Sequence, residues 1–166
     1  NIYSSGAIPP GPGIIDKSCF SQWYASTFIV NGIVYQTAEH WMMAGKASLF
    51  NDSDSLENIL SADKPAEAKS IGRLVKNFDP EIWSASSYAI VVEGNRHKFL
   101  QHEALQNSLL QTGDKIIVEA SPADPIWGIG LPQDNMEAKN PFQWRGTNLL
   151  GFALMEVRDF LRSDLK

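Results

Sequence analysis

The chain has 166 residues, 43% of them hydrophobic, which is enough to bury the core of one globular domain. Its net charge of −5 argues against binding nucleic acid or a membrane surface through bulk positive charge, although a local basic pocket is compatible with it. The single cysteine, Cys19, excludes an internal disulfide framework and a metal site built from several cysteines.

We expect a soluble, cytoplasmic protein that uses neither a metal nor a cofactor. No apolar run approaches the roughly 20 residues of a membrane-spanning helix, and the sequence contains no signal-peptide pattern. The histidines His40, His97 and His102 form no H-E-x-x-H pattern, which argues against a zinc hydrolase.

The segment 1–18 is expected to be rich in loops. Glycine and proline recur between Gly6 and Gly13, and both residue types interrupt regular structure. No later stretch has the composition of a linker, and no internal repeat is visible. Residues 1–166 are therefore expected to form a single domain.

The strongest short-range pattern predicts a β-hairpin. Asn31-Gly32 separates two β-rich runs, Thr27–Val30 and Ile33–Tyr35. Both turn residues tolerate positive φ, as a two-residue hairpin turn requires. The hairpin leads directly into the next predicted helix.

That helix begins after Thr37, whose hydroxyl can accept a hydrogen bond from a free N–H of the first turn. Four residues share one face of it at helical spacing: Glu39, Met42, Met43 and Lys46. A carboxylate on a core-facing side needs a partner or a raised pKa, and both are routes to chemistry. The alternative is a capping glutamate in an ordinary surface helix.

The rest of the chain is predicted to be mostly helical. Helices are expected at about residues 56–60, 65–76, 80–100, 103–110 and from 149 onward. The Gly94-Asn95 pair is expected to weaken the longest of them. A strand is predicted at Lys115–Glu119, followed by the loop-rich segment 120–147, which is long enough to suggest a functional loop.

Two of these helices are assigned an apolar face. For the helix at 65–76 the apolar face is Ile71, Leu74, Val75 and Phe78. Asn148 is expected to cap the last helix. The apolar stripe of this helix is expected at Leu149, Phe152, Ala153, Met155 or Glu156, and Phe160. The predicted fold is α+β, mostly helical, with a small antiparallel sheet.

No standard nucleotide or nucleophile motif is present. Gly128-Ile129-Gly130 lacks the third glycine of a dinucleotide fingerprint, and Gly45-Lys46 lacks P-loop spacing. Cys19 has no catalytic motif around it. The residues left to carry chemistry are carboxylates, tryptophans and a few cations.

Several motifs in a fixed order resemble one known family. They are Phe20-Ser21-Gln22-Trp23, Tyr35-Gln36-Thr37-Ala38-Glu39-His40-Trp41, Lys46-Ala47, Ala68-Lys69, Gly72-Arg73, Trp83, Lys98-Phe99, Leu109-Leu110-Gln111-Thr112-Gly113, Glu119-Ala120-Ser121, Asp124-Pro125-Ile126-Trp127-Gly128-Ile129-Gly130-Leu131 and Trp144-Arg145-Gly146-Thr147-Asn148-Leu149-Leu150-Gly151. Together they resemble the NADAR family, also called the YbiA-like or riboflavin-biosynthesis-intermediate N-glycosidase family. The similarity spans nearly the whole chain.

The resemblance implies cleavage of an N-glycosidic bond between a ribose phosphate and a nitrogenous base. One branch of the family hydrolyses early riboflavin intermediates and releases ribose 5-phosphate from an aminopyrimidine. Another branch removes ADP-ribose from guanine bases and so reverses a DNA-modifying toxin. The implied partner is therefore a small ribosyl-phosphate or ADP-ribosyl substrate, or ADP-ribosylated DNA.

The same resemblance implies the site residues. The family's catalytic glutamate falls on Glu39, its loop aspartate on Asp124 and its functional tryptophan on Trp83. Further substrate-binding candidates are Gln22, Lys46, Arg73, Trp127 and Arg145. We expect Glu39 to act at C1′, where cleavage builds oxocarbenium character that a carboxylate stabilises. Asp124 would position water or ribose hydroxyls, and Trp83 would stack on the leaving base. Of the cations, Arg73 and Lys46 are favoured as phosphate ligands.

Two positions depart from the family pattern. The family usually has asparagine where this chain has Gln22, whose longer amide would reach a ribose hydroxyl from a shifted position. Some members carry aspartate where this chain has Ile129. If that aspartate is the active carboxylate, the assignment to Asp124 is wrong.

Each assignment has a structural alternative. Asp124 before Pro125 can simply shape a turn, Trp83 can be a core residue, and Arg73 with Lys69 can form a solvated face. For the whole protein, two alternatives remain open. One is a module that binds ADP-ribose or a related nucleotide without hydrolysis, and the other is an antitoxin that acts by protein contact alone.

Overall fold

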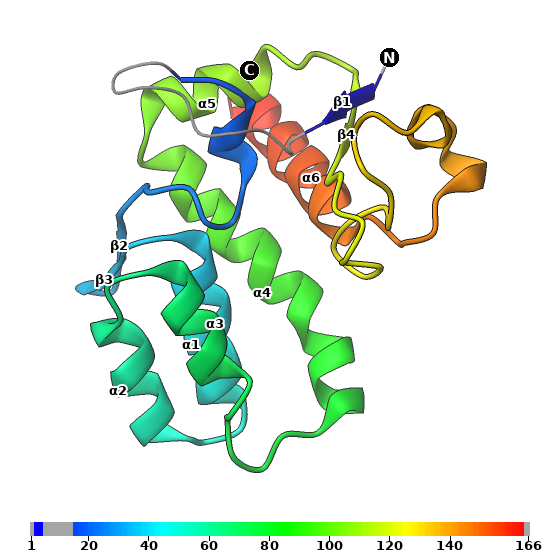
Figure 1. Ribbon diagram of the computed structural model, residues 1–166. Coiled ribbons are helices and arrows are strands. Elements are labelled where there is room, and N and C mark those ends of the chain that lie inside the picture. The colour runs from blue at the N-terminus through cyan, green and yellow to red at the C-terminus, as the bar shows by residue number, and fades with distance from the viewer. Residues whose placement is uncertain (1, 5–14, 165–166) are drawn as a thin grey trace. The chain divides into compact units, whose positions relative to one another are not determined.

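The computed structural model describes residues 2–4 and 15–164, so the predicted loop at Gly6–Gly13 lies outside the described residues (Figure 1). The chain divides into two compact units, one formed by Asn1–Ser21 with His102–Lys166 and the other by Gln22–Gln101. The described residues contain six α-helices and two small two-stranded sheets. The α+β prediction is therefore confirmed.

The unit Gln22–Gln101 consists of a hairpin and four helices. Its elements are β2 (Phe28–Val30), β3 (Ile33–Tyr35), α1 (Ala38–Leu49), α2 (Ser53–Ser61), α3 (Pro65–Gly72) and α4 (Pro80–Leu100). Helix α1 packs against α2, α3 and α4 (Figure 1). It is the central helix of this unit.

The predicted hairpin is confirmed. Strands β2 and β3 pair antiparallel, with Val30 opposite Ile33. Asn31 has φ 51° and Gly32 has φ 79°, the left-handed conformation that a tight hairpin turn needs.

The predicted start of α1 is confirmed as well. The Thr37 hydroxyl accepts a hydrogen bond from the main-chain N–H of His40, at 3.2 Å. The buried His40 ring joins this cap to α2, because its Nε2 lies 2.9 Å from the Ala62 carbonyl and its Nδ1 lies 2.7 Å from the Thr37 hydroxyl. Since a carbonyl only accepts, Nε2 carries a proton and donates to Ala62. His40 therefore anchors the start of the helix.

Helix α3 ends at Gly72, earlier than predicted. Val75 is buried, but Leu74 is 78% exposed, so the predicted apolar face at 71, 74, 75 and 78 is wrong. The apolar spacing continued past a glycine that ends the helix. Gly72 also lies directly against the Met43 side chain, where a Cβ would collide with its sulfur.

Helix α4 runs unbroken through Gly94-Asn95, so the pair does not interrupt the helix. Gly94 has a packing role, because a Cβ at this position would collide with the ring of Trp41. The Trp41 indole N–H also donates to the Ile90 carbonyl at 2.8 Å. Gly45 makes the reciprocal approach, since a Cβ there would lie 2.8 Å from Ile90 Cγ2. Helices α1 and α4 thus meet at closer range than larger residues would allow.

Aromatic rings tie the hairpin to this helix pair. Phe28 of β2 stacks on Tyr35 of β3 with ring centroids 5.6 Å apart. Trp41 lies 4.9 Å from Tyr35 in an edge-to-face contact and 5.5 Å from the His97 ring of α4. Such pairs add stability beyond the area they bury.

The second unit combines a parallel strand pair with two helices. Its elements are β1 (Ile2–Ser4), η1 (Lys17–Phe20), α5 (Glu103–Leu110), β4 (Ile116–Val118), η2 (Met136–Lys139), η3 (Pro141–Gln143) and α6 (Leu149–Asp164). Strand β4 confirms the predicted strand, whereas β1 is a strand for which no prediction was made, in the segment that was expected to be rich in loops. Its main-chain groups pair with β4 in parallel, from Ile2 opposite Ile116 onward.

Helix α6 packs on β4 through a face that differs from the predicted stripe. Ala153 of the predicted stripe is buried, but Phe152 is 47% exposed. Because Leu150, Leu154 and Val157 are buried as well, the buried face is rotated about the helix axis from the predicted one. The side chain of Asn148 does not cap the helix. Its Oδ1 accepts from the Glu119 N–H at 2.9 Å and its Nδ2 donates to the Ile117 carbonyl at 3.0 Å. The Asn148 amide thus hydrogen-bonds main-chain groups at the end of β4 and is not available as a cap.

Within residues 2–4 and 15–164, none of the helices has the length and apolar character needed to cross a membrane.

The packing of Gly94 predicts the effect of adding one methyl group. Gly94→Ala should lower the free energy of unfolding by about 1–3 kcal/mol, because overpacking against Trp41 outweighs the gain in helix propensity. Urea denaturation followed by circular dichroism measures the change. Ser84→Ala, at an exposed position of the same helix, is the control and should stay within about 0.5 kcal/mol. An unchanged or raised stability of Gly94→Ala would contradict the packing argument.

Candidate functional site

A buried carboxylate lies in the first turn of α1. Glu39 is only 6% exposed, so the alternative of an ordinary surface helix does not fit this position. Its main-chain N–H donates to the Gln22 carbonyl at 3.0 Å, which fixes the approach of the preceding segment to the helix start. Met42 and Met43 on the same helix face are buried too, and Lys46 is half-buried.

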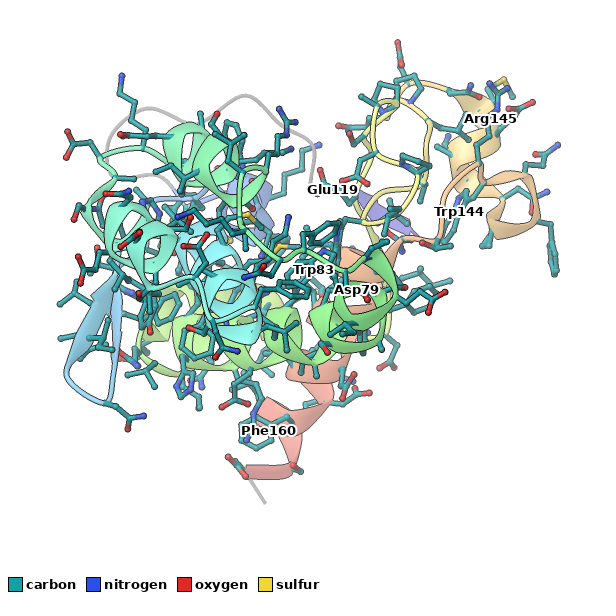
Figure 2. The ribbon with its side chains drawn as sticks, turned by 90° about the horizontal axis from the view of Figure 1, so that it is seen from below. Asp79, Trp83, Glu119, Trp144, Arg145 and Phe160 are labelled. Carbon is teal, nitrogen blue, oxygen red and sulfur yellow. The ribbon has the colours of Figure 1, made fainter. Side chains whose placement is uncertain are left out.

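Two aromatic rings surround the Lys46 ammonium. Its Nζ lies 4.3 Å from the ring centroid of Phe78 and 5.6 Å from that of Trp83. Phe50 supports Phe78 from the side in an edge-to-face contact with centroids 5.4 Å apart. Figure 2 shows Trp83 in the first turn of α4, one turn after the capping residue Asp79. We call Lys46, Phe78 and Trp83 the ammonium cage.

The cage keeps a cation in a partly dry environment. Burial lowers the pKa of the Lys46 ammonium from its usual value of 10.5. In the part of the chain that the structure describes, no carboxylate forms an ion pair with Lys46. Cation–π contacts stabilise the charge, and an anionic ligand would add the missing partner.

Sequence reasoning found only part of this site. It identified Lys46 and Trp83 but assigned Phe78 to the apolar face of a helix. It also missed Asn95, whose Nδ2 donates to the Oε1 of Gln22 at 2.8 Å. The spacing of residues along the chain predicts neither the contact of Lys46 with Phe78 nor that of Gln22 with Asn95.

The predicted phosphate ligand Arg73 follows the last residue of α3 and is exposed. Among the described residues, its guanidinium has neither a hydrogen bond nor an ion pair. Lys69, one turn earlier, has its Nζ 5.9 Å from the ring centroid of Trp23. The role of Arg73 stays a prediction.

Asp124, in the other unit, shapes a turn. Its Oδ1 accepts hydrogen bonds from the main-chain N–H groups of Ile126, at 3.0 Å, and Trp127, at 2.8 Å. The structural alternative for Asp124 is therefore correct as far as this oxygen is concerned. Trp127 is half-buried at the end of the turn. A catalytic role of Asp124 and a binding role of Trp127 stay predictions.

Arg145 lies on the surface of the same unit, beside Trp144 (Figure 2). Its guanidinium forms an ion pair with Glu137 at 3.2 Å, and both side chains are largely exposed. The Trp144 ring packs on a small core that includes Ile129, and its indole N–H donates to the Ala138 carbonyl at 2.9 Å. Trp144 and Ile129 therefore contribute to this small core, and substrate binding by Arg145 stays a prediction.

Comparisons with known proteins agree with the resemblance seen in the sequence. The family model of the NADAR domain matches residues 13–162. The chain is 46% identical over 145 residues to N-glycosidase R617 of Acanthamoeba polyphaga mimivirus, covering 84% of this chain and 85% of that protein. It is 31% identical over 145 residues to N-glycosidase Npun_R5314 of Nostoc punctiforme, with coverages of 87% and 86%. The NMR structure of the E. coli protein YbiA has a TM-score of 0.77 and 27% identity, covering 99% of this chain and 86% of that one.

The ammonium cage predicts an unusual lysine. The pKa of Lys46 should lie below 10.5, because its surroundings disfavour the charged form. In Trp83→Ala the pKa should rise towards 10.5, since water then reaches Nζ. NMR titration of the lysine side-chain resonances measures both values, with Lys46→Arg identifying the signal. A Lys46 pKa at or above 10.5 in the wild-type protein would contradict the claim that burial disfavours the charged form.

Proposed function

This chain belongs to the NADAR domain family, and we propose that it is an N-glycosidase that hydrolyses the C1′–N bond between a phosphorylated ribose and a nitrogenous base. The observation that carries the proposal is the buried carboxylate of Glu39 at the start of α1. Two relatives named as N-glycosidases, matched over most of their length, support the same class of reaction.

Glu39 is the residue that we assign to the reacting centre. As the C1′–N bond breaks, positive charge develops on the ribose ring, and a nearby carboxylate stabilises that charge. The oxygen of a water molecule then bonds to C1′. One proton of this water is lost to a base, and the departing nitrogen gains a proton. The balanced products are a ribose with a hydroxyl at C1′ and the free base.

The ammonium cage supplies binding. Lys46 has a cation without a carboxylate partner among the described residues, which suits a substrate phosphate. The half-buried Trp83 ring offers an aromatic surface on which a leaving base can stack. Arg73 is a second cation for the phosphate, and Gln22 can hydrogen-bond the ribose.

For Asp124, Trp127 and Arg145, which belong to the other unit, we propose separately the roles that the family resemblance implies. One carboxylate oxygen of Asp124 is used by its turn, and the second oxygen is the one that we assign to a water or a ribose hydroxyl. Trp127 and Arg145 are proposed to contact the substrate.

The carboxylates and water suffice for this chemistry, so we propose that the reaction is independent of metal ions. The cytoplasmic location expected from the sequence also stays a prediction.

Two substrate classes fit the proposed reaction. One is a ribosylaminopyrimidine phosphate, and the other is guanine that carries ADP-ribose in a nucleic acid. The net charge of −5 favours the small substrate, because binding of a nucleic acid draws much of its strength from phosphate contacts. A single extruded guanine would need few such contacts, so the second class fits a local pocket.

Glu39→Gln tests whether the chain hydrolyses its ligand or merely binds it. The rate of base release should fall at least about a hundredfold in this variant. Substrate should still bind, because the glutamine amide has the shape of the carboxylate but lacks its charge. Purified protein is offered each substrate separately with EDTA present, and free base is quantified by chromatography. Glu57→Gln, at an exposed position of α2, is the matched control.

Asp124→Asn separates the two roles of Asp124 in the same assay. The asparagine Oδ1 can still accept from Ile126 and Trp127, so the turn should persist and only the charge is lost. Reduced turnover with unchanged thermal stability supports a catalytic role. Full activity of both Glu39→Gln and Asp124→Asn, or no base release by folded wild-type protein, would overturn the proposed function.

A further inference from the structure

The side-chain amides of buried Asn95 and half-buried Gln22 form a pair beside the start of α1. Asn95 of α4 is 0% exposed, and its Nδ2 donates twice, to the Val91 carbonyl at 2.9 Å and to the Oε1 of Gln22 at 2.8 Å. The main-chain carbonyl of Gln22 accepts from Glu39 N–H at 3.0 Å. Gln22 thus joins the amide pair to the main chain of Glu39, the proposed catalytic residue.

The orientation of both amides follows from their partners. The Val91 carbonyl has no hydrogen to give, so the Asn95 atom that faces it must be the nitrogen. The same nitrogen donates to Gln22, so the Gln22 atom that it meets must be the oxygen. The other two atoms are then fixed as a donor, Gln22 Nε2, and an acceptor, Asn95 Oδ1.

These two remaining atoms are buried and unused. Neither Gln22 Nε2 nor Asn95 Oδ1 has a hydrogen-bond partner in the parts of the chain that the structure describes. A buried polar atom without a partner destabilises the fold, and asparagine is also a poor residue for a helix interior. Asn148 differs from Asn95 in this respect: its amide is equally buried, but both its oxygen and its nitrogen form hydrogen bonds.

A ligand that offers both an acceptor and a donor would satisfy the pair. A hydroxyl group has both, and a ribose carries hydroxyls on neighbouring carbons. If C1′ lies at Glu39, the nearest hydroxyl is the one on C2′, and Gln22 is hydrogen-bonded to Glu39 through the main chain. A carbonyl or phosphate oxygen could use the donor alone and would leave Asn95 Oδ1 unsatisfied.

We propose that the Gln22–Asn95 amide pair recognises the 2′-hydroxyl of the substrate's ribose, with Gln22 Nε2 as the binding group and Asn95 as the residue that positions it. This inference rests on the proposed function, because it places the sugar at Glu39. It makes the protein selective for ribosyl over 2′-deoxyribosyl compounds. A site built to bind a hydroxyl rejects the analogue that lacks it, since its own buried groups then stay unpaired.

Sugar phosphates test this selectivity without any need for turnover. Isothermal titration calorimetry compares D-ribose 5-phosphate with 2-deoxy-D-ribose 5-phosphate. The wild-type protein should bind the ribose compound more tightly by about tenfold or more. In Asn95→Leu and Gln22→Met the preference should fall to about twofold or less, because each change removes one member of the pair but keeps similar bulk. Asn58→Leu, at an exposed position of α2, should keep the wild-type preference.

Two variants are used because one of them can change the binding indirectly, by disturbing the fold. Asn95→Leu can disturb the packing of α4, whereas Gln22→Met leaves the bond from Asn95 to Val91 intact. Thermal denaturation shows that each variant is folded. The proposal is overturned if the wild-type protein binds neither sugar phosphate or binds both equally, or if the folded variants keep the preference. Base release without sugar selectivity would leave the proposed function standing and remove this inference. Sugar selectivity without base release would leave the amide pair as a ribose-binding site and remove the proposed hydrolysis.

Discussion

The central constraint of the unit Gln22–Gln101 is that its middle helix buries one charged side chain and partly buries a second. Helix α1 carries Glu39 into the interior and holds Lys46 half-buried two turns later. Moving such groups out of water is unfavourable unless hydrogen bonds, rings or opposite charges replace the lost hydration. The Phe78 and Trp83 rings do so in part for Lys46. A structure that keeps charges under this constraint is typical of a site that binds or transforms a charged ligand.

The packing around α1 brings its neighbouring helices close. Gly72 lets α3 approach Met43, and Gly94 lets α4 approach Trp41, so both helices lie close to the central one. Side chains on packed helices hold their positions better than side chains on loops, and catalysis depends on charge that is oriented before the reaction begins. Gly94, which was expected to weaken its helix, and Gly72 therefore both belong to the frame of the candidate site.

Local chemistry explains which parts of the structure the sequence could predict. The turn at Asn31-Gly32 and the cap at Thr37 each depend on a few adjacent residues, and both predictions are confirmed. Asn148 was predicted as a cap because that is the usual local use of asparagine, yet its amide binds a strand that lies far away in the sequence. The pairing of Asn95 with Gln22 escaped prediction for the same reason. Contacts between distant segments leave no trace in residue spacing.

The account depends on where the substrate's anomeric carbon lies. The most direct measurement is a crystal structure of the Glu39→Gln variant with an uncleaved ribosyl substrate. The account predicts that C1′ lies within about 3.5 Å of the side chain at position 39, the distance expected of a group that acts on the reacting atom. A substrate bound with C1′ far from that side chain would contradict it.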